Sequence, residues 1–111
     1  MEIRKNVFHG YLRDGEIDRF NAEVALLAGP VDLEGCDLSN LDLSRADLRT
    51  ANLKNSYLKL ADLRGVDLSA AQLEGASFNH SRISGAYFPP EFHASEIRLS
   101  LEYGTRLRSA R

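Results

Sequence analysis

The sequence predicts an all-β solenoid made of five-residue units, and the recurrence and the period of its apolar residues predict it. Between residues 31 and 90 a large apolar residue occupies the third place of every unit. The first place is small in nearly every unit, the second is mostly Asp or Asn, and the last two are polar, charged or Gly. A chain that turns a corner after each short extended piece can point its first and third places inward, where stacked coils bury them.

A period of five excludes both a single long helix and a continuous strand. On an α-helix each step of five residues advances about 500°, so the apolar side chains would spiral around the axis. A strand alternates its side chains with a period of two. Neither element lines one face with every fifth residue. The remaining interpretation is a chain that turns a corner after each unit and stacks the resulting coils.

Composition narrows the class of protein further. The 111 residues suffice for one domain, are 43% hydrophobic and include no Trp. The 14 basic and 16 acidic residues give a formal charge of −2, which predicts no direct binding to nucleic acid. No apolar run approaches the roughly 18 residues of a membrane span, and a single cysteine excludes an internal disulfide. We therefore expect a soluble, cytoplasmic protein without membrane contact.

Residues 1–30 are predicted to form an N-terminal cap over the first coil. A short strand is expected over residues 3–11. Residues 16–28 show helical spacing, with Asp14 as the N-cap and Gly29 and Pro30 as the end of the helix. The apolar side of this amphipathic helix consists of Ile17, Phe20, Val24 and Leu27. A cap is needed because an uncovered end would leave apolar side chains and backbone groups of the first coil in water.

Residues 31–90 are predicted to form the solenoid itself. The third-place side chains form its core, and no unit lacks one. They are Leu33, Leu38, Leu43, Leu48, Leu53, Leu58, Leu63, Leu68, Leu73, Phe78, Ile83 and Phe88. Gly falls only in the fifth place within this segment, where a corner needs permissive backbone angles.

Residues 91–111 are predicted to form a C-terminal cap. Pro89 and Pro90 interrupt the repeat, and a helix is expected with Ser95 as its cap and Gly104 as its end. Ala94, Ile97 and Leu101 would share one face of this helix. The competing alternation of Ile97, Leu99, Leu101 and Tyr103 would instead make a strand, and the helix is favoured. The tail, residues 106–111, carries three arginines and is expected to fray.

The twelve units, from VDLEG to AYFPP, resemble the A(D/N)LXX motif of the pentapeptide-repeat family over more than half of the chain. The resemblance implies a right-handed quadrilateral β-helix with four units per coil, and therefore about three coils. Residues twenty apart would then lie above one another. On the outer surface this stacks Asp42 on Asp62, Asp47 on Asp67, and Leu60 beneath His80.

No set of residues predicts a catalyst or a cofactor site. His9, His80 and His93 lie without a second ligand at metal-binding spacing. Cys36 occupies an inward first place and is expected to behave as a small core residue. No Gly-rich phosphate loop is present. We therefore expect no enzymatic activity, no bound metal and no cofactor.

Two outer surfaces are candidates for binding. The first is the set of acidic columns, Asp42 with Asp62 and Asp47 with Asp67. The six bases among the eight acids of residues 31–90 should balance most of this charge. The second is an apolar patch in which Tyr57 and Leu60 point outward, with Leu60 beneath His80 and the patch beside Tyr87 or the C-terminal cap.

The predicted function is that of a rigid, non-catalytic scaffold or protein-interaction module. Its partner is either an unidentified protein or a second copy of the chain, bound through a cap. The alternative follows from the resemblance, because some family members imitate DNA and bind DNA gyrase. In that case the chain would be a DNA-mimicking inhibitor or protector of gyrase, and the acidic columns would be its contact surface.

Overall fold

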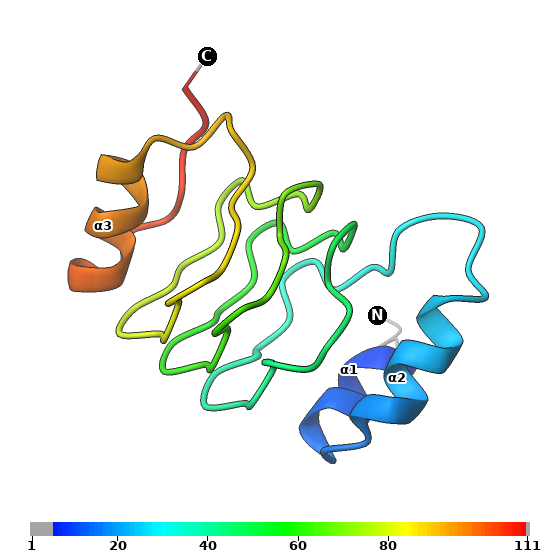
Figure 1. Ribbon diagram of the computed structural model, residues 1–111. Helices are drawn as coiled ribbons and strands as arrows, with labels where there is room; N and C mark the ends of the chain where they lie inside the picture. The colour runs from blue at the N-terminus through cyan, green and yellow to red at the C-terminus, as the bar shows by residue number, and fades with distance from the viewer. Residues whose placement is uncertain (1–5, 111) are drawn as a thin grey trace, which may run out of the picture.

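The computed structural model describes residues 6–110 (Figure 1). Helix α1 (Val7–Arg13) and helix α2 (Ile17–Val24) lie at one end of a stack of backbone coils, and helix α3 (Ala94–Tyr103) lies at the other end. Within these residues, no helix combines the length and the apolar character needed to cross a membrane. The three helices are therefore terminal elements around a repeat that forms the middle of the molecule.

The coils are joined by isolated parallel bridges between residues twenty apart. Three of the columns contain the bridged sets Asp32–Asn52–Gln72, Asp37–Tyr57–Ser77 and Asp42–Asp62–Arg82, and a fourth contains Asp67–Tyr87. Four units therefore make one coil, and residues 31–90 make three. Within the described residues no bridge lengthens into a strand, so the helices are the only regular elements longer than a single bridged residue. The predicted all-β class is therefore too simple.

Backbone hydrogen bonds hold each coil to the next. The N–H of Asn52 donates to the carbonyl of Val31 at 2.9 Å, and the carbonyl of Asn52 accepts from the N–H of Leu33 at 2.9 Å. The same pair of bonds recurs around the coils, which explains why a single bridged residue per unit is enough to define the register. At nearly every corner the N–H of a first-place residue donates to the third-place carbonyl before it, as from Cys36 to Leu33 at 3.1 Å.

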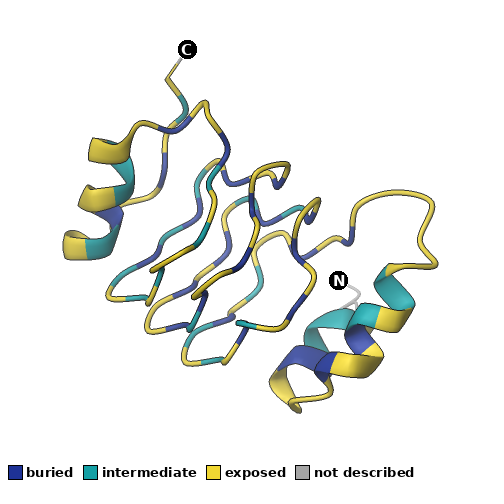
Figure 2. Cartoon of the chain, in the orientation of Figure 1, coloured by how far each residue is buried: buried dark blue, intermediate teal, exposed yellow. Residues whose placement is uncertain are grey.

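The third-place side chains fill the interior of the stack, and Figure 2 shows buried residues recurring along the coils. From Leu33 to Phe78 each of them is at most 1% exposed. Ile83 and Phe88, the last two of the series, are only partly buried because no further coil covers them. The ring of Phe88 packs edge-on against that of Phe78, with centroids 5.7 Å apart.

The N-terminal cap differs from the expectation at its start. The part of the predicted strand that the structure describes, residues 6–11, belongs to α1 and its N-cap, and residues 3–5 lie outside the described range. The side chain of Asn6 caps this helix by accepting the N–H of His9 at 3.1 Å. Helical spacing lets Tyr11 and Leu12 become buried, and the ring of Phe8 packs edge-on against that of Phe20 at 6.0 Å.

Helix α2 is shorter than predicted. Asp14 does not cap it but ends α1, and α2 begins after Glu16, whose side chain makes no capping bond. The helix ends at Val24 instead of residue 28, and the following Leu26 is 85% exposed. Leu27, predicted to lie on the buried side, is also among the exposed apolar residues.

Side chains from the N-terminal helices bond to the open edge of the first coil. The amide of Asn6 donates to the carbonyl of Asp32 at 2.7 Å. From α2, the side chain of Asn21 donates to the carbonyl of Arg45 at 2.9 Å and accepts from the N–H of Asp47 at 2.8 Å. Asparagine amides thus take the place of the coil that would otherwise lie below.

The predicted C-terminal helix is confirmed over residues 94–103, and the alternative strand is wrong. His93, not Ser95, occupies the N-cap position, and Gly104 ends the helix with a left-handed φ of 72°. The fraying expected for the tail is also wrong over the described residues. Leu107 is buried, its N–H donates to the carbonyl of Ala76 at 2.8 Å, and its carbonyl accepts from Gly75 at 2.8 Å.

Candidate interaction surface

The second-place acids and amides have a structural role in the corners. In seven units the side-chain oxygen accepts the backbone N–H of the residue two places later, at 2.9–3.4 Å. The oxygens belong to Asp32, Asp37, Asp42, Asp47, Asn52, Asp62 and Asp67. This is the Asx turn, which fixes the backbone where the chain changes direction. The preference for Asp and Asn in this place is therefore explained without a ligand.

The predicted column of Asp42 and Asp62 forms, but its charge is balanced. The two residues are bridged across coils, and Arg82 follows in the third coil. Arg64 donates two bonds to the carboxylate of Asp62, at 3.0 and 2.7 Å, and these bonds lower the pKa of Asp62 to about 2. The hydroxyl of Ser44 bonds to Asp42 at 2.6 Å and lowers the pKa of that carboxyl, while the negative charge of Asp62 acts in the opposite direction.

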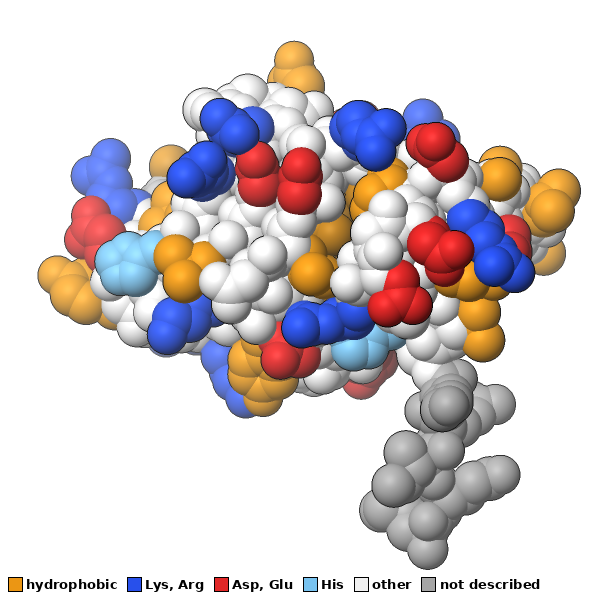
Figure 3. All heavy atoms as spheres, turned by 90° about the horizontal axis from the view of Figure 1, so that it is seen from below, with side chains coloured by type: hydrophobic (Ala, Val, Ile, Leu, Met, Phe, Trp, Pro, Cys, Tyr) orange, Lys and Arg blue, Asp and Glu red, His pale blue; other side chains and the backbone are white. Residues whose placement is uncertain are grey.

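The second acidic column is less regular. Asp67 is bridged to Tyr87, whereas no bridge joins Asp47 to Asp67 in the part of the chain that the structure describes. Hydrogen bonds from Ser69 lower the pKa of Asp67, so this carboxylate is also held within its own unit. On the face seen in Figure 3, acidic and basic side chains alternate and do not separate by sign. The acids therefore do not form a continuous negative surface on this face.

Tyr57 and Leu60 both lie on the outer surface of the middle coil. Tyr57 is 45% exposed and Leu60 is 49% exposed. Leu60 has a left-handed φ of 59°, a conformation that the other units give mainly to Gly or Asn. His80, twenty residues later, shares this conformation, and its N–H donates to the carbonyl of Leu101 at 2.9 Å. Tyr87 is exposed as well but belongs to another column, so the structure does not bring it to Tyr57.

A groove of about 570 Å³ lies beside Tyr57, between the coils and the segment that follows α3. Tyr57 and Lys59 line it from the middle coil, and Tyr103 and Arg106 line it from the C-terminal cap. The guanidinium of Arg106 lies 5.8 Å from the centre of the Tyr57 ring and donates to the Tyr57 hydroxyl at 3.2 Å. The sequence predicts the C-terminal cap as one neighbour of this patch but does not identify Tyr103 and Arg106, because no local pattern shows that the tail returns to the coils.

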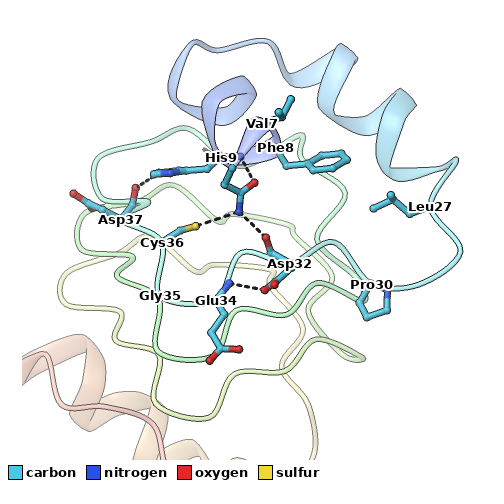
Figure 4. A pocket seen from close by; sticks show the side chains of 11 residues that line it. Val7, Phe8, His9, Leu27, Pro30, Asp32, Glu34, Gly35, Cys36 and Asp37 are labelled. Atoms are coloured by element: carbon cyan, nitrogen blue, oxygen red, sulfur yellow. Dashed lines mark hydrogen bonds between the residues drawn. The ribbon is translucent and has the colours of Figure 1, made fainter. Parts of the chain in front are cut away.

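A second hollow, of about 800 Å³, lies between the N-terminal helices and the first coil (Figure 4). Its polar groups are already bonded to one another. A ring nitrogen of His9 lies 2.7 Å from the carbonyl oxygen of Asp37, and the amide of Asn6 donates to the sulfur of Cys36 at 3.7 Å. Burial raises the pKa of the Cys36 thiol, which disfavours a reactive thiolate. Nowhere in the described residues do three His, Cys, Asp or Glu side chains gather to hold a metal ion.

Comparison with known proteins gives one match. A family model described as pentapeptide repeats matches the chain in eight copies, over residues 31–65 and 56–88. No curated protein and no solved structure matches the chain. The matched segment coincides with the coils and leaves out the three helices and the tail, and with them the C-terminal side of the groove.

Proposed function

Because the chain belongs to the pentapeptide-repeat family, we propose that it is a rigid, non-catalytic protein-interaction module. We also propose the finer form of its fold, a right-handed β-helix with four faces. The bridges between residues twenty apart support four units per coil. The grid of backbone hydrogen bonds supports rigidity, and a rigid surface loses little conformational entropy when a partner binds.

One observation carries the proposal: an apolar side chain lies on the surface where the backbone disfavours it. Leu60 has a φ of 59° and is 49% exposed. A left-handed conformation costs a residue with a Cβ atom roughly 1–2 kcal/mol, and a leucine that stays about half exposed regains only part of this cost by burial. Strain of this kind concentrates at functional positions. The ring of Tyr57, three residues earlier, is exposed on the same coil, and a protein partner would cover both side chains.

The arrangement of polar groups supports a role without catalysis. The second-place carboxylates are engaged in corner turns, and Asp62 is paired with Arg64. The thiol of Cys36 is partly buried with a raised pKa. None of these groups combines a nucleophile with a neighbouring base at an open surface, which a covalent or acid–base mechanism would need.

Affinity capture tests the proposal. The full chain is immobilised, and proteins that bind it from cells expressing it are compared with those that bind the Tyr57→Ser, Leu60→Ser double variant. The matched control is Tyr87→Ser with Leu99→Ser, which removes the same two residue types from other exposed positions. We expect at least one partner to bind the wild type and the control, and to be lost from the Tyr57/Leu60 variant. Partners that bind all three proteins equally, or no partner at all, would contradict the proposal.

The alternative function, DNA mimicry toward gyrase, has weaker support because the acids are paired or held in turns. A supercoiling assay decides it. Asp42→Asn with Asp62→Asn removes two charges and keeps the turns, since Asn52 makes the same bond at 3.2 Å. Mimicry predicts inhibition or protection of gyrase that this variant loses. The interaction module predicts no effect of either protein on gyrase.

A further inference from the structure

The groove beside Tyr57 is built from two separate parts of the chain. Its floor comes from the column Asp37–Tyr57–Ser77 and from fourth-place neighbours such as Lys59, while Tyr103 and Arg106 form one wall. Its volume of about 570 Å³ falls within the range of ligand sites. The groove is an open hollow and not an enclosed cavity, so it suits a few side chains of an extended peptide better than an enclosed small molecule.

Two cations in this groove have no acidic partner. Within residues 6–110, neither Lys59 nor Arg106 forms an ion pair, whereas Arg19, Arg45, Arg64 and Arg108 each contact an Asp or Glu. Arg106 uses one of its N–H donors in the hydrogen bond to the Tyr57 hydroxyl. A guanidinium carries five N–H donors, so the others stay available for a carboxylate.

The groove residues are held in place before any partner binds. The ring of Tyr57 supports the guanidinium of Arg106, and Leu107 next to it is fixed to the third coil by two backbone bonds of 2.8 Å. Gly104 turns the chain toward the coils, and a Cβ atom there would lie 3.2 Å from the side chain of Asn79. Preorganised cations lose less entropy on binding than mobile ones.

One acidic residue makes the charge of the groove differ between its two ends. Asp37 lies at its first-coil end, where the N–H and hydroxyl of Ser39 bond to its carboxylate at 3.0 and 2.6 Å. Those bonds lower the pKa of Asp37, so the group stays negative at neutral pH. A ligand with negative charge at every step would be repelled there. A chain with one or two acidic residues next to apolar ones avoids that repulsion.

We infer that this groove binds an acidic, extended segment of a partner protein. Lys59 and Arg106 bond to the carboxylates of the segment, and an apolar side chain lies between the rings of Tyr57 and Tyr103, of which the second is 72% exposed. A nucleic acid strand fits less well, because its phosphates repeat at each nucleotide, two cations neutralise few of them, and Asp37 opposes them. The inference rests on the proposed function and names the chemistry of its partner.

Selection from a random peptide library tests the inference. Phage-displayed dodecapeptides are selected on the immobilised full chain, and the enriched peptides are titrated against three proteins: the wild type, Lys59→Gln with Arg106→Gln, and Arg49→Gln with Arg98→Gln. The last pair is a charge-matched control, because Arg49 and Arg98 are exposed and lie outside the groove. Circular dichroism and thermal melting establish that all three are folded.

We expect the enriched peptides to combine Asp or Glu with an aliphatic or aromatic residue. Their affinity should fall by about tenfold or more in the Lys59/Arg106 variant and with added salt, and stay unchanged in the control. Asp37→Asn should strengthen binding. Neutral or basic peptides, equal binding by both variants, or no enrichment would overturn the inference. So would oligothymidylate that binds the wild type but not the Lys59/Arg106 variant while no acidic peptide binds, because the groove would then be a nucleic-acid site.

The two proposals fail in different ways. If capture from cells yields a partner that depends on Tyr57 and Leu60 but binds the Lys59/Arg106 variant normally, the interaction module stands and the acidic-peptide inference is wrong. If acidic peptides bind the groove but capture yields no partner that depends on Tyr57 and Leu60, the carrying observation of the proposed function fails.

Discussion

Replacing Ser100 with Ala tests how α3 closes the stack of coils. Ser100 is fully buried, and its hydroxyl oxygen accepts a 2.8 Å hydrogen bond from the backbone N–H of Phe78. In the middle coil the equivalent N–H, that of Leu58, donates to the carbonyl of Ser77 in the next coil. The third coil has no such neighbour, so a helix side chain supplies the acceptor. Alanine at position 100 would leave a buried donor without a partner.

The size of the effect follows from two opposing terms. An unsatisfied buried donor costs about 1–3 kcal/mol, whereas Ala is better than Ser in a helix by up to about 0.5 kcal/mol. The expected loss of unfolding free energy is therefore about 0.5–2.5 kcal/mol. For a domain of this size the melting temperature should fall by roughly 2–12 °C.

Thermal melting followed by circular dichroism measures this loss, and hydrogen exchange locates it. The control is Ser95→Ala, because Ser95 is exposed on the same helix and its hydroxyl forms no hydrogen bond within the described residues. We expect Ser95→Ala to melt at the wild-type temperature or slightly above, and exchange at the amide of Phe78 to accelerate only in Ser100→Ala. If both variants melt together and the amide of Phe78 keeps its protection, the reasoning about the C-terminal cap is refuted.

Three further predictions concern the core, the charge pair and the strained corner. Leu63→Asp should leave the chain unfolded, because an unpaired buried carboxylate costs several kcal/mol beyond the lost burial, and the total stability of a domain is only about 5–15 kcal/mol. Leu63→Met, the control, should fold. A folded Leu63→Asp variant would contradict the inward orientation of this side chain. Arg64→Gln should raise the pKa of Asp62 from about 2 toward 3.8 in an NMR titration. Because the pKa of Asp62 is lower in the folded chain than in the unfolded chain, the Arg64–Asp62 pair stabilises the fold above about pH 4 and loses its effect toward pH 2. The wild type should therefore lose more unfolding free energy over that interval than Arg64→Gln. Equal losses would count against the pair. Leu60→Asn should raise the unfolding free energy by roughly 0.5–1 kcal/mol, because Asn tolerates the left-handed backbone at position 60 better than Leu. Leu60→Ala should not raise it. Equal melting temperatures of the two variants would show that position 60 carries no such strain.

The interior of the coils could be predicted because the five-residue period leaves few ways to bury every third-place residue. Both ends were harder, since each short terminal segment fits more than one pattern. Val7, Phe8 and Tyr11 belong to residue types that favour strands, yet Phe8, Tyr11 and Leu12 also have helical spacing, and Asn6 can cap a helix. The helix wins because it lets Phe8 pack against Phe20 of α2, a contact that the sequence does not reveal.

Half of the candidate site could be predicted in the same way. The place of Tyr57 and Leu60 in their units predicts that both point outward, and both are exposed. Nothing local predicts that Tyr103 and Arg106 line a groove with Tyr57, since the two segments are more than forty residues apart and meet because α3 and Leu107 both bond to the third coil. The position of the tail depends on backbone groups at the open edge of that coil, and these have no sequence signature.

The corner turns change where function should be sought in this chain. A second-place acid that bonds to its own backbone is selected by the fold, so its frequency along the sequence carries no information about a ligand. The same holds for Gly in the fifth place and Leu in the third. What remains are the positions where the repeat is broken at a cost or without a structural gain. Leu60 accepts a strained backbone, Tyr57 gives up a turn-forming side chain, and Lys59, next to both, forms no ion pair within residues 6–110. Because these three residues lie on one corner of the middle coil, the departures from the pattern, and not the pattern itself, indicate the binding surface.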